Sequence, residues 1–415
     1  MVDGALSAAA PLSVESLMDE AASRAASDDW GDLGFTATLG LLLDSCTRSA
    51  ALTPAGWGVL RSVVLRHLRN RLALQDRLRC RPDLRDGPTT AVVVTGLPRT
   101  GTTLVHNLLA LDGELRALRL WEALRPFPPL GEKAPGKAAL VEQAQAWLAR
   151  FYQLAPGMRA VHPATAEGPE ECDALLQNSF ASQHIDDMVD ADAYSAWFAT
   201  DPLRDEYRYY ALQLAAMTED ERGAAPDGGA DASGLSVPPE PGAASPASTW
   251  VLKSPGHLGH LDALLDAIPR AVVLHCHRHP VEAVPSYASL IRTVRAPHTE
   301  RLDPGLVGRQ ALERSCLAVR RALAVREAAG ASRFVDVSYG RLVAEPLAVM
   351  GEVYDRLGRP LRAEVRADMG RWLVANPQHL HGPHNYGLDD FALNAGQVSD
   401  AFAPYLDRLG SWMTG

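Results

Sequence analysis

Lysine is scarce in this chain, and the charge balance is not that of a nucleic-acid-binding protein. Of 40 basic residues only Lys133, Lys137 and Lys253 are lysines, and acidic residues outnumber basic ones to give a net charge of −10. Because nucleic-acid backbones bind basic surfaces, this balance argues against a nucleic-acid partner. Lys253 stands out from the arginine-rich background because it ends a short apolar segment.

Long apolar runs and paired cysteines are also missing. No apolar run approaches the roughly 20 residues of a transmembrane helix. The first 17 residues lack the basic stretch and apolar core of a signal peptide. With 47% apolar residues the chain is nevertheless expected to fold. We therefore predict a reduced, cytoplasmic protein in which the cysteines are small buried side chains. These cysteines are odd in number and form no C-x-x-C pair: Cys46, Cys80, Cys172, Cys276 and Cys316.

The apolar pattern predicts an N-terminal helical subdomain over residues 1–88 and an α/β core over 89–415. Core strands are predicted at 91–95, 250–253, 271–276 and 334–337. Core helices are predicted at 102–111, 137–151, 168–182, 202–217, 257–267, 280–294 and 305–329. Repeated strand–helix units of this kind give a parallel sheet covered by helices on both faces.

One segment inside the core has a different composition. Residues 219–249 are rich in glycine and proline and have almost no bulky apolar side chains. Such a segment cannot offset the entropy lost on ordering. We predict a flexible surface insert here.

The first predicted strand runs into a loop with the spacing Gly96-x4-Gly101. This is the spacing of an NTP-binding P-loop, whose inward-facing amides and following helix form an anion cradle. Thr102 stands where such a loop carries its lysine, and the one cation inside the loop is Arg99. The loop therefore predicts an anion site that is not built for ordinary ATP or GTP.

A second candidate anion site follows the strand at 271–276. Arg278 lies at the end of that strand, and Ser286 lies on the helix that follows, in the pattern R-x7-S. Ligands of α/β sheets bind at the carboxyl ends of strands, and a guanidinium with a hydroxyl can clamp a phosphate.

The two motifs, in this order, resemble the 5′-phosphosulfate loop and the 3′-phosphate site of sulfotransferases that use 3′-phosphoadenosine-5′-phosphosulfate (PAPS). The segment Leu-Lys-Ser-Pro-Gly-His-Leu at 252–258 resembles the K-S-P-x-H-L segment of a bacterial branch. Residues 338–343 resemble the segment near the adenine, and Trp121-Glu122 and the tail from His384 also look like that branch. The resemblance spans residues 33–409 without the insert. The better-known cytosolic branch has lysine in place of Arg99.

The resemblance implies a P-loop-like central parallel sheet and a PAPS-dependent sulfotransferase of the EC 2.8.2 type. Such an enzyme moves a sulfuryl group from PAPS to a hydroxyl or amine of a small-molecule, lipid or glycoside acceptor. It releases 3′-phosphoadenosine 5′-phosphate (PAP) and requires no metal. The donor-binding residues that the resemblance implies are Gly96, Pro98, Arg99, Thr100, Gly101, Thr102, Thr103, Arg278, Ser286 and Tyr339.

Sulfuryl transfer depends on positioning and on stabilising the charge of the leaving group. Arg99 and Lys253 are the expected catalytic cations. The acceptor must also lose a proton, so a base is required. His257 is the first candidate, since a helix N-terminus keeps imidazole neutral near pH 7. Glu170 is the second, because the neighbouring acidic residues could raise its pKa.

Two other classes remain open: a nucleotide kinase or NTPase that uses the same loop, and a non-catalytic nucleotide-binding protein. Apolar and aromatic residues at 121–130 and 194–198 suggest a hydrophobic or glycosidic acceptor. The sequence does not define the oligomeric state. Two histidine groups resemble metal sites but bring no cysteine or acidic partner at ligand spacing, so no metal is predicted. These groups are His275, His277 and His279, and His379, His381 and His384.

Overall fold

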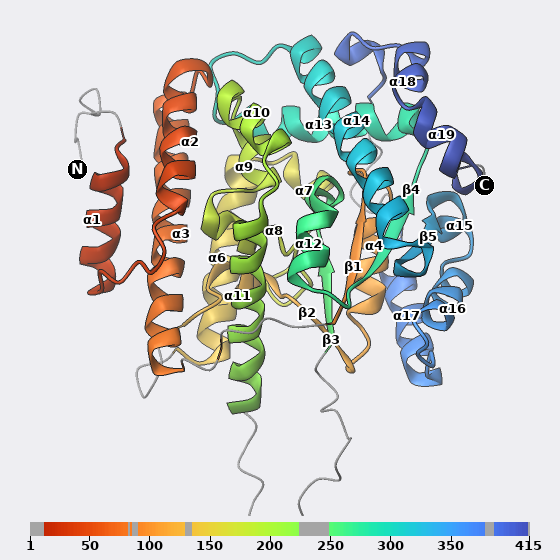
Figure 1. Cartoon of the computed structure of the whole chain (residues 1–415), viewed down its shortest axis with the longest axis horizontal. Helices are drawn as coiled ribbons and strands as arrows, with labels where there is room; N and C mark the ends of the chain where they lie inside the picture. Colours follow the sequence, from red (N-terminus) through yellow and green to blue (C-terminus); the bar gives the residue numbers. More distant parts are fainter. Residues whose placement is uncertain are drawn as a thin grey trace, which may run out of the picture.

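A parallel sheet of five strands forms the centre of the protein (Figure 1). The computed structural model describes residues 12–81, 84, 90–128, 135–223, 249–377 and 386–413. The strand order is β2-β3-β1-β4-β5, and all four pairings are parallel. The strands are β1 Ala91–Gly96, β2 Leu115–Ala117, β3 Thr249–Lys253, β4 Val272–His277 and β5 Phe334–Ser338. The predicted α/β fold and its four strands are confirmed. The three-residue β2 was missed because so short a segment has no readable alternation.

Helices cover both faces of this sheet, as the strand–helix alternation predicted. On one face Val94 and Leu274 pack in a cluster with residues of α4 (Thr102–Leu109), α16 (Pro346–Arg356) and α17 (Ala363–Ala375). On the other face Val93, Leu252 and Val273 pack in a cluster with residues of α11 (Arg204–Gly223), α12 (Leu261–Ala267), α13 (Pro280–Arg295) and α14 (Pro304–Ala329). Because both faces are buried, the strands are almost continuously apolar.

The three N-terminal helices lie at the opposite end of the molecule from α16 and α17 (Figure 1). They are α1 Val14–Ala25, α2 Phe35–Ser49 and α3 Pro54–Cys80. They share one apolar cluster with Phe180, Ile185 and Tyr194, which come from the middle of the chain. The helical character of this region is confirmed, and its division from the core at residue 88 stays a prediction.

The helix predicted over 168–182 is wrong. The N–H of Glu170 bonds to the carbonyl of Leu118 at 2.8 Å, and Pro169 forms an antiparallel bridge with Arg119. Only α8 (Asp173–Leu176) and the 3-10 turn η1 (Gln177–Ser179) follow. Gly168 and Pro169 favour this extended start, because both residues are poor helix formers.

The remaining helices complete the outer layers. They are α5 Leu120–Leu124, α6 Lys137–Leu154, α7 Met158–Val161, α9 Gln183–Met188, α10 Asp192–Thr200, α15 Tyr339–Ala344, α18 Ala395–Ala401 and α19 Ala403–Leu409. Four further 3-10 turns are η2 Pro255–His260, η3 Ala331–Arg333, η4 Asp389–Phe391 and η5 Gly410–Trp412. At the insert, α11 continues to Gly223 and β3 begins at Thr249, so the predicted boundaries shift. The rest of the insert lies outside the described residues.

Two further predictions concerned the burial of the cysteines and the lack of a transmembrane helix. Cys46, Cys172, Cys276 and Cys316 are buried and unpaired as predicted, whereas Cys80 is exposed. Within the described residues, none of the helices combines the length and the apolar character that crossing a bilayer requires.

The sheet packs tightly against α4, α16 and α17, so a cavity made between them should lower the free energy of unfolding substantially. Leu274 on β4 is fully buried and Leu33 is 53% exposed. We expect Leu274→Ala to lower the free energy of unfolding by about 2–5 kcal/mol and the matched Leu33→Ala by less than about 0.5 kcal/mol. Denaturant midpoints measure both. Similar losses from the two variants would contradict this assignment of the core.

Candidate active site

The loop between β1 and α4 has a backbone that glycine makes possible. Gly96 has φ 154° and Gly101 has φ 92°, values that residues with a side chain rarely adopt. A Cβ at Gly96 would lie 2.4 Å from the carbonyl oxygen of Cys276. Thr100 Oγ1 donates to the carbonyl of Leu97 at 2.7 Å and closes the turn. The loop therefore passes tightly over β4 into the N-terminus of α4, where unpaired backbone N–H groups favour an anion.

The second predicted anion site lies directly beside this loop. Arg278 Nη1 donates to the carbonyl of Arg99 at 3.2 Å, and its guanidinium lies 4.5 Å from the ring centroid of Tyr339. Arg99 Nε donates to Ser286 Oγ at 3.4 Å. Arg278 also pairs with Glu282, which lies on the helix that follows it, α13. The structure thus brings Arg99, Arg278, Ser286 and Tyr339 together, although they come from three separate parts of the chain.

A cleft of about 1700 Å³ opens over both loops. Pockets for a single small ligand usually measure about 300–1,000 Å³, so this one has room for two molecules. Predicted site residues on its wall are Pro98, Arg99, Gly101, Thr102, Thr103, Glu170, Lys253, Arg278 and Tyr339. Gly96, Thr100 and Ser286 do not line the cleft. Gly96 and Thr100 set the conformation of the loop, and Ser286 accepts a hydrogen bond from Arg99, which does line the cleft.

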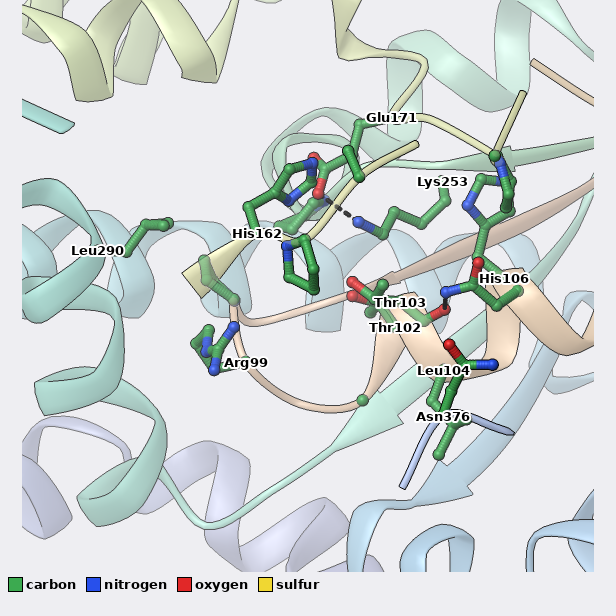
Figure 2. A pocket seen from close by; sticks show the side chains of 18 of the residues that line it. Arg99, Thr102, Thr103, Leu104, His106, His162, Glu171, Lys253, Leu290 and Asn376 are labelled. Carbon is green, nitrogen blue, oxygen red and sulfur yellow. Dashed lines mark hydrogen bonds and ion pairs between the residues drawn. The ribbon is translucent and has the colours of Figure 1, made fainter. Parts of the chain in front are cut away.

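Lys253 forms a buried ion pair that the sequence reading missed. It ends β3, is 2% exposed, and pairs with Glu171, which is 8% exposed. Burial opposes ionisation of Glu171, but the charge of Lys253 and a hydrogen bond from His184 outweigh it and hold the pKa of Glu171 well below its usual value. Figure 2 shows Lys253 directed at Glu171, with Arg99 lying apart from both. The two predicted catalytic cations therefore occupy separate parts of the cleft.

Glu170, the second base candidate, faces the cleft beside a histidine. Its Oε1 lies 3.2 Å from His162 Nε2 and accepts the N–H of Glu171 at 2.7 Å. Among the described residues this leaves Oε2 without a hydrogen-bond partner. Burial opposes ionisation, but His162 and that N–H outweigh it and hold the pKa of Glu170 below its usual value. Glu170 is therefore an ionised carboxylate near neutral pH. His162 was missed because no motif marks it.

His257, the first base candidate, lies outside this cleft. Its side chain is completely buried, with Nδ1 2.8 Å from the Tyr207 hydroxyl and Nε2 3.1 Å from Cys172 Sγ. Burial lowers its pKa to about 3. The predicted helix start at 257 is instead the 3-10 turn η2, and the ring contacts α11 rather than the cleft. The geometry does not support His257 as the base.

A further histidine on the cleft wall was also missed. His106 on α4 is 2% exposed, and its Nε2 has no hydrogen-bond partner among the described residues. Burial, reinforced by the charge of Lys253, lowers its pKa to about 3. His106 therefore contributes a neutral imidazole to the wall next to Lys253, and its place one turn after Thr102 was the available signal.

Of the first group of histidines that resemble a metal site in the sequence, His275 and His277 lie on β4 and His279 caps the N-terminus of α13; none of them lines the cleft. His275 and His277 do meet an acidic partner, Asp336, which β5 brings alongside. His277 Nε2 lies 2.8 Å from Asp336 and its Nδ1 lies 2.7 Å from the Tyr405 hydroxyl. Asp336 also pairs with Arg326, so the group joins α14 and α19 to the sheet. The second group, 379–384, lies outside the described residues.

A model of the sulfotransferase family matches residues 91–363, which is more than half of the chain, and the chain belongs to that family. Sulfotransferase STF1 of Mycobacterium tuberculosis H37Rv has a similar structure, with 26% sequence identity and a TM-score of 0.78 over 95% of this chain and 99% of that chain. Sulfotransferase STF9 of Mycobacterium avium is 26% identical, with a TM-score of 0.77 over 95% of this chain and 96% of that chain. No curated protein sequence matches.

The burial of His257 predicts a measurable pH dependence. Its pKa is about 3 in the folded protein against an ordinary value of 6.5. Between these values the unfolded chain binds a proton that the folded protein does not, so this group makes stability fall as pH falls from 6.5 towards 3. We expect His257→Asn to flatten that fall by up to about 1.4 kcal/mol per pH unit. Thermal unfolding at several pH values tests this, and parallel curves for the two proteins would contradict it.

Proposed function

We propose that the protein transfers a sulfuryl group from PAPS to a hydroxyl or amine of an acceptor and releases PAP. The observation that carries this proposal is the meeting of Arg99, Arg278 and Ser286 beside a phosphate loop that has Thr102 in place of a lysine. A donor with phosphate groups at both its 5′ and 3′ positions matches two adjoining anion sites.

The loop from Leu97 to Thr103 would hold the 5′-phosphosulfate with its N–H groups and the N-terminus of α4. Arg278 and Ser286 would hold the 3′-phosphate, since a planar guanidinium suits phosphate oxygens. Arg99, which bonds Ser286, would lie between the two groups. Tyr339 offers an aromatic face beside Arg278.

The acceptor would enter along α6. Gln145, Leu148, Ala149 and Tyr152 line the cleft, and their spacing places them on one face of that helix. None of the described residues among 121–130 and 194–198 lines this cleft, so the argument for a hydrophobic acceptor does not rest on them. The mainly apolar stripe on α6 supports an acceptor with a hydrophobic part.

In the proposed reaction the acceptor oxygen or nitrogen forms a bond to sulfur as the bond between sulfur and the phosphate oxygen breaks. Electrons of the broken bond leave with PAP, and Arg99 and the loop N–H groups stabilise that charge. Lys253 would neutralise the sulfuryl oxygens. Glu170, oriented by His162, would take the proton of the acceptor through its open Oε2.

Nucleotide binding tests the donor assignment. We expect PAP to raise the melting temperature clearly and adenosine 5′-monophosphate to raise it much less, because only PAP carries a 3′-phosphate for Arg278 and Ser286. Arg278→Ala should remove this difference by weakening PAP by about 2–4 kcal/mol. If ATP with Mg²⁺ stabilised the protein as much as PAP, a kinase or NTPase would be favoured instead.

The base assignment is tested by single-turnover transfer from PAPS. We expect Glu170→Gln to slow transfer by about 10²–10⁴-fold, because a glutamine amide cannot accept the proton. The affinity for PAP should change little. His257→Asn is the control and should transfer at close to the wild-type rate, since His257 does not line the cleft. The opposite ranking of the two variants would return the role of base to His257.

A further inference from the structure

Lys253 is the first member of a chain of alternating charges that leads away from the cleft. Glu171 Oε1 pairs with Lys253, and Glu171 Oε2 lies 3.1 Å from His184 Nε2. His184 Nδ1 lies 3.4 Å from Asp173 Oδ2. Lys253 and Glu171 line the cleft, whereas His184 and Asp173 do not. Asp173 is fixed from behind by the hydroxyl of Ser182 and by the backbone N–H of His184.

The alternation balances two cations against two carboxylates. Desolvation opposes the charge of His184, but Asp173 and Glu171 outweigh it and raise its pKa above the usual value. Glu171 therefore has a second cationic partner besides Lys253. This matters because removing one partner of a buried ion pair leaves an uncompensated charge, which is strongly destabilising.

We propose that His184 is a positioning residue that allows Lys253 to leave Glu171 and bind the sulfuryl group of the donor. When Lys253 turns to the sulfuryl oxygens, Glu171 keeps His184 as its partner, and Asp173 keeps His184 charged. Without His184 the carboxylate would hold Lys253 back. This inference rests on the proposed function, because it takes a donor with a sulfuryl group as the ligand.

The test compares affinities for PAPS and PAP, which differ in the sulfuryl group and need no acceptor. The wild type should bind PAPS more tightly than PAP. His184→Gln, which keeps a hydrogen-bonding side chain but no charge, should reduce this preference about tenfold and leave PAP affinity within about twofold. Lys253→Met should remove the preference. A merely structural role for His184 would change both affinities together.

A double variant tests whether His184 acts through Glu171. In a Glu171→Gln background Lys253 has no carboxylate to leave, so adding His184→Gln should change the PAPS preference less than twofold. His277→Gln is the matched control, because His277 also pairs with a carboxylate, Asp336, but on another part of the sheet. It should lower the melting temperature and leave the PAPS preference unchanged.

The outcomes separate the two proposals. If the wild type binds neither nucleotide, the proposed function fails. If it prefers PAPS and His184→Gln retains that preference, or if the Glu171 and His184 effects multiply in the double variant, the proposed function stands and the role of His184 is overturned.

Discussion

Parallel pairing of β3, β1, β4 and β5 places the carboxyl ends of these strands at one edge of the sheet. Val94 pairs with Lys253, and Gly96 pairs with Cys276, so the loop between β1 and α4, Lys253 and Arg278 lie at nearly the same level of the sheet. The positions of Arg99, Lys253 and Arg278 depend on this register. A shift of one residue would turn Lys253 to the other face of the sheet.

The positive side chains of the cleft differ in burial and in their partners. Arg99 and Arg278 lie on a surface that is open to solvent in part, where they can meet phosphate groups at little cost. Lys253 is buried and already neutralised by Glu171. A ligand group can pair with Lys253 only if Lys253 leaves Glu171. We therefore expect the cleft around Lys253 to select ligand groups by their charge more strongly than the cleft around Arg99 and Arg278 does.

Much of the fold could be predicted from the sequence because its strands are buried on both faces and read as apolar runs. The loop between β1 and α4 and Arg278 could be placed together because both follow strands of one parallel sheet. Glu171, His162 and His184 could not be placed. They belong to 155–190, where short turns replace long helices and the pairing of Glu170 with Leu118 sets the course of the chain.

His257 shows a different limit of sequence reasoning. Its position four residues after Lys253 was read correctly as near the sheet edge, but the direction of its ring depends on the 3-10 turn η2 and on the hydroxyl of Tyr207. The turn begins within the motif, but Tyr207 lies on α11, far from the motif in sequence, and no local pattern predicts that contact. Local spacing therefore locates a residue along the chain, and only tertiary packing decides which side of an element its side chain faces.

A crystal structure of the complex with PAP would show directly whether the two anion sites hold the donor. We expect density for the 3′-phosphate against Arg278 and Ser286, and for the 5′-phosphate against the loop N–H groups of 97–103. Lys253 should lie beside the open end of the 5′-phosphate, on the side of Glu170. A 3′-phosphate bound elsewhere, or a 5′-phosphate outside the loop, would contradict this donor assignment.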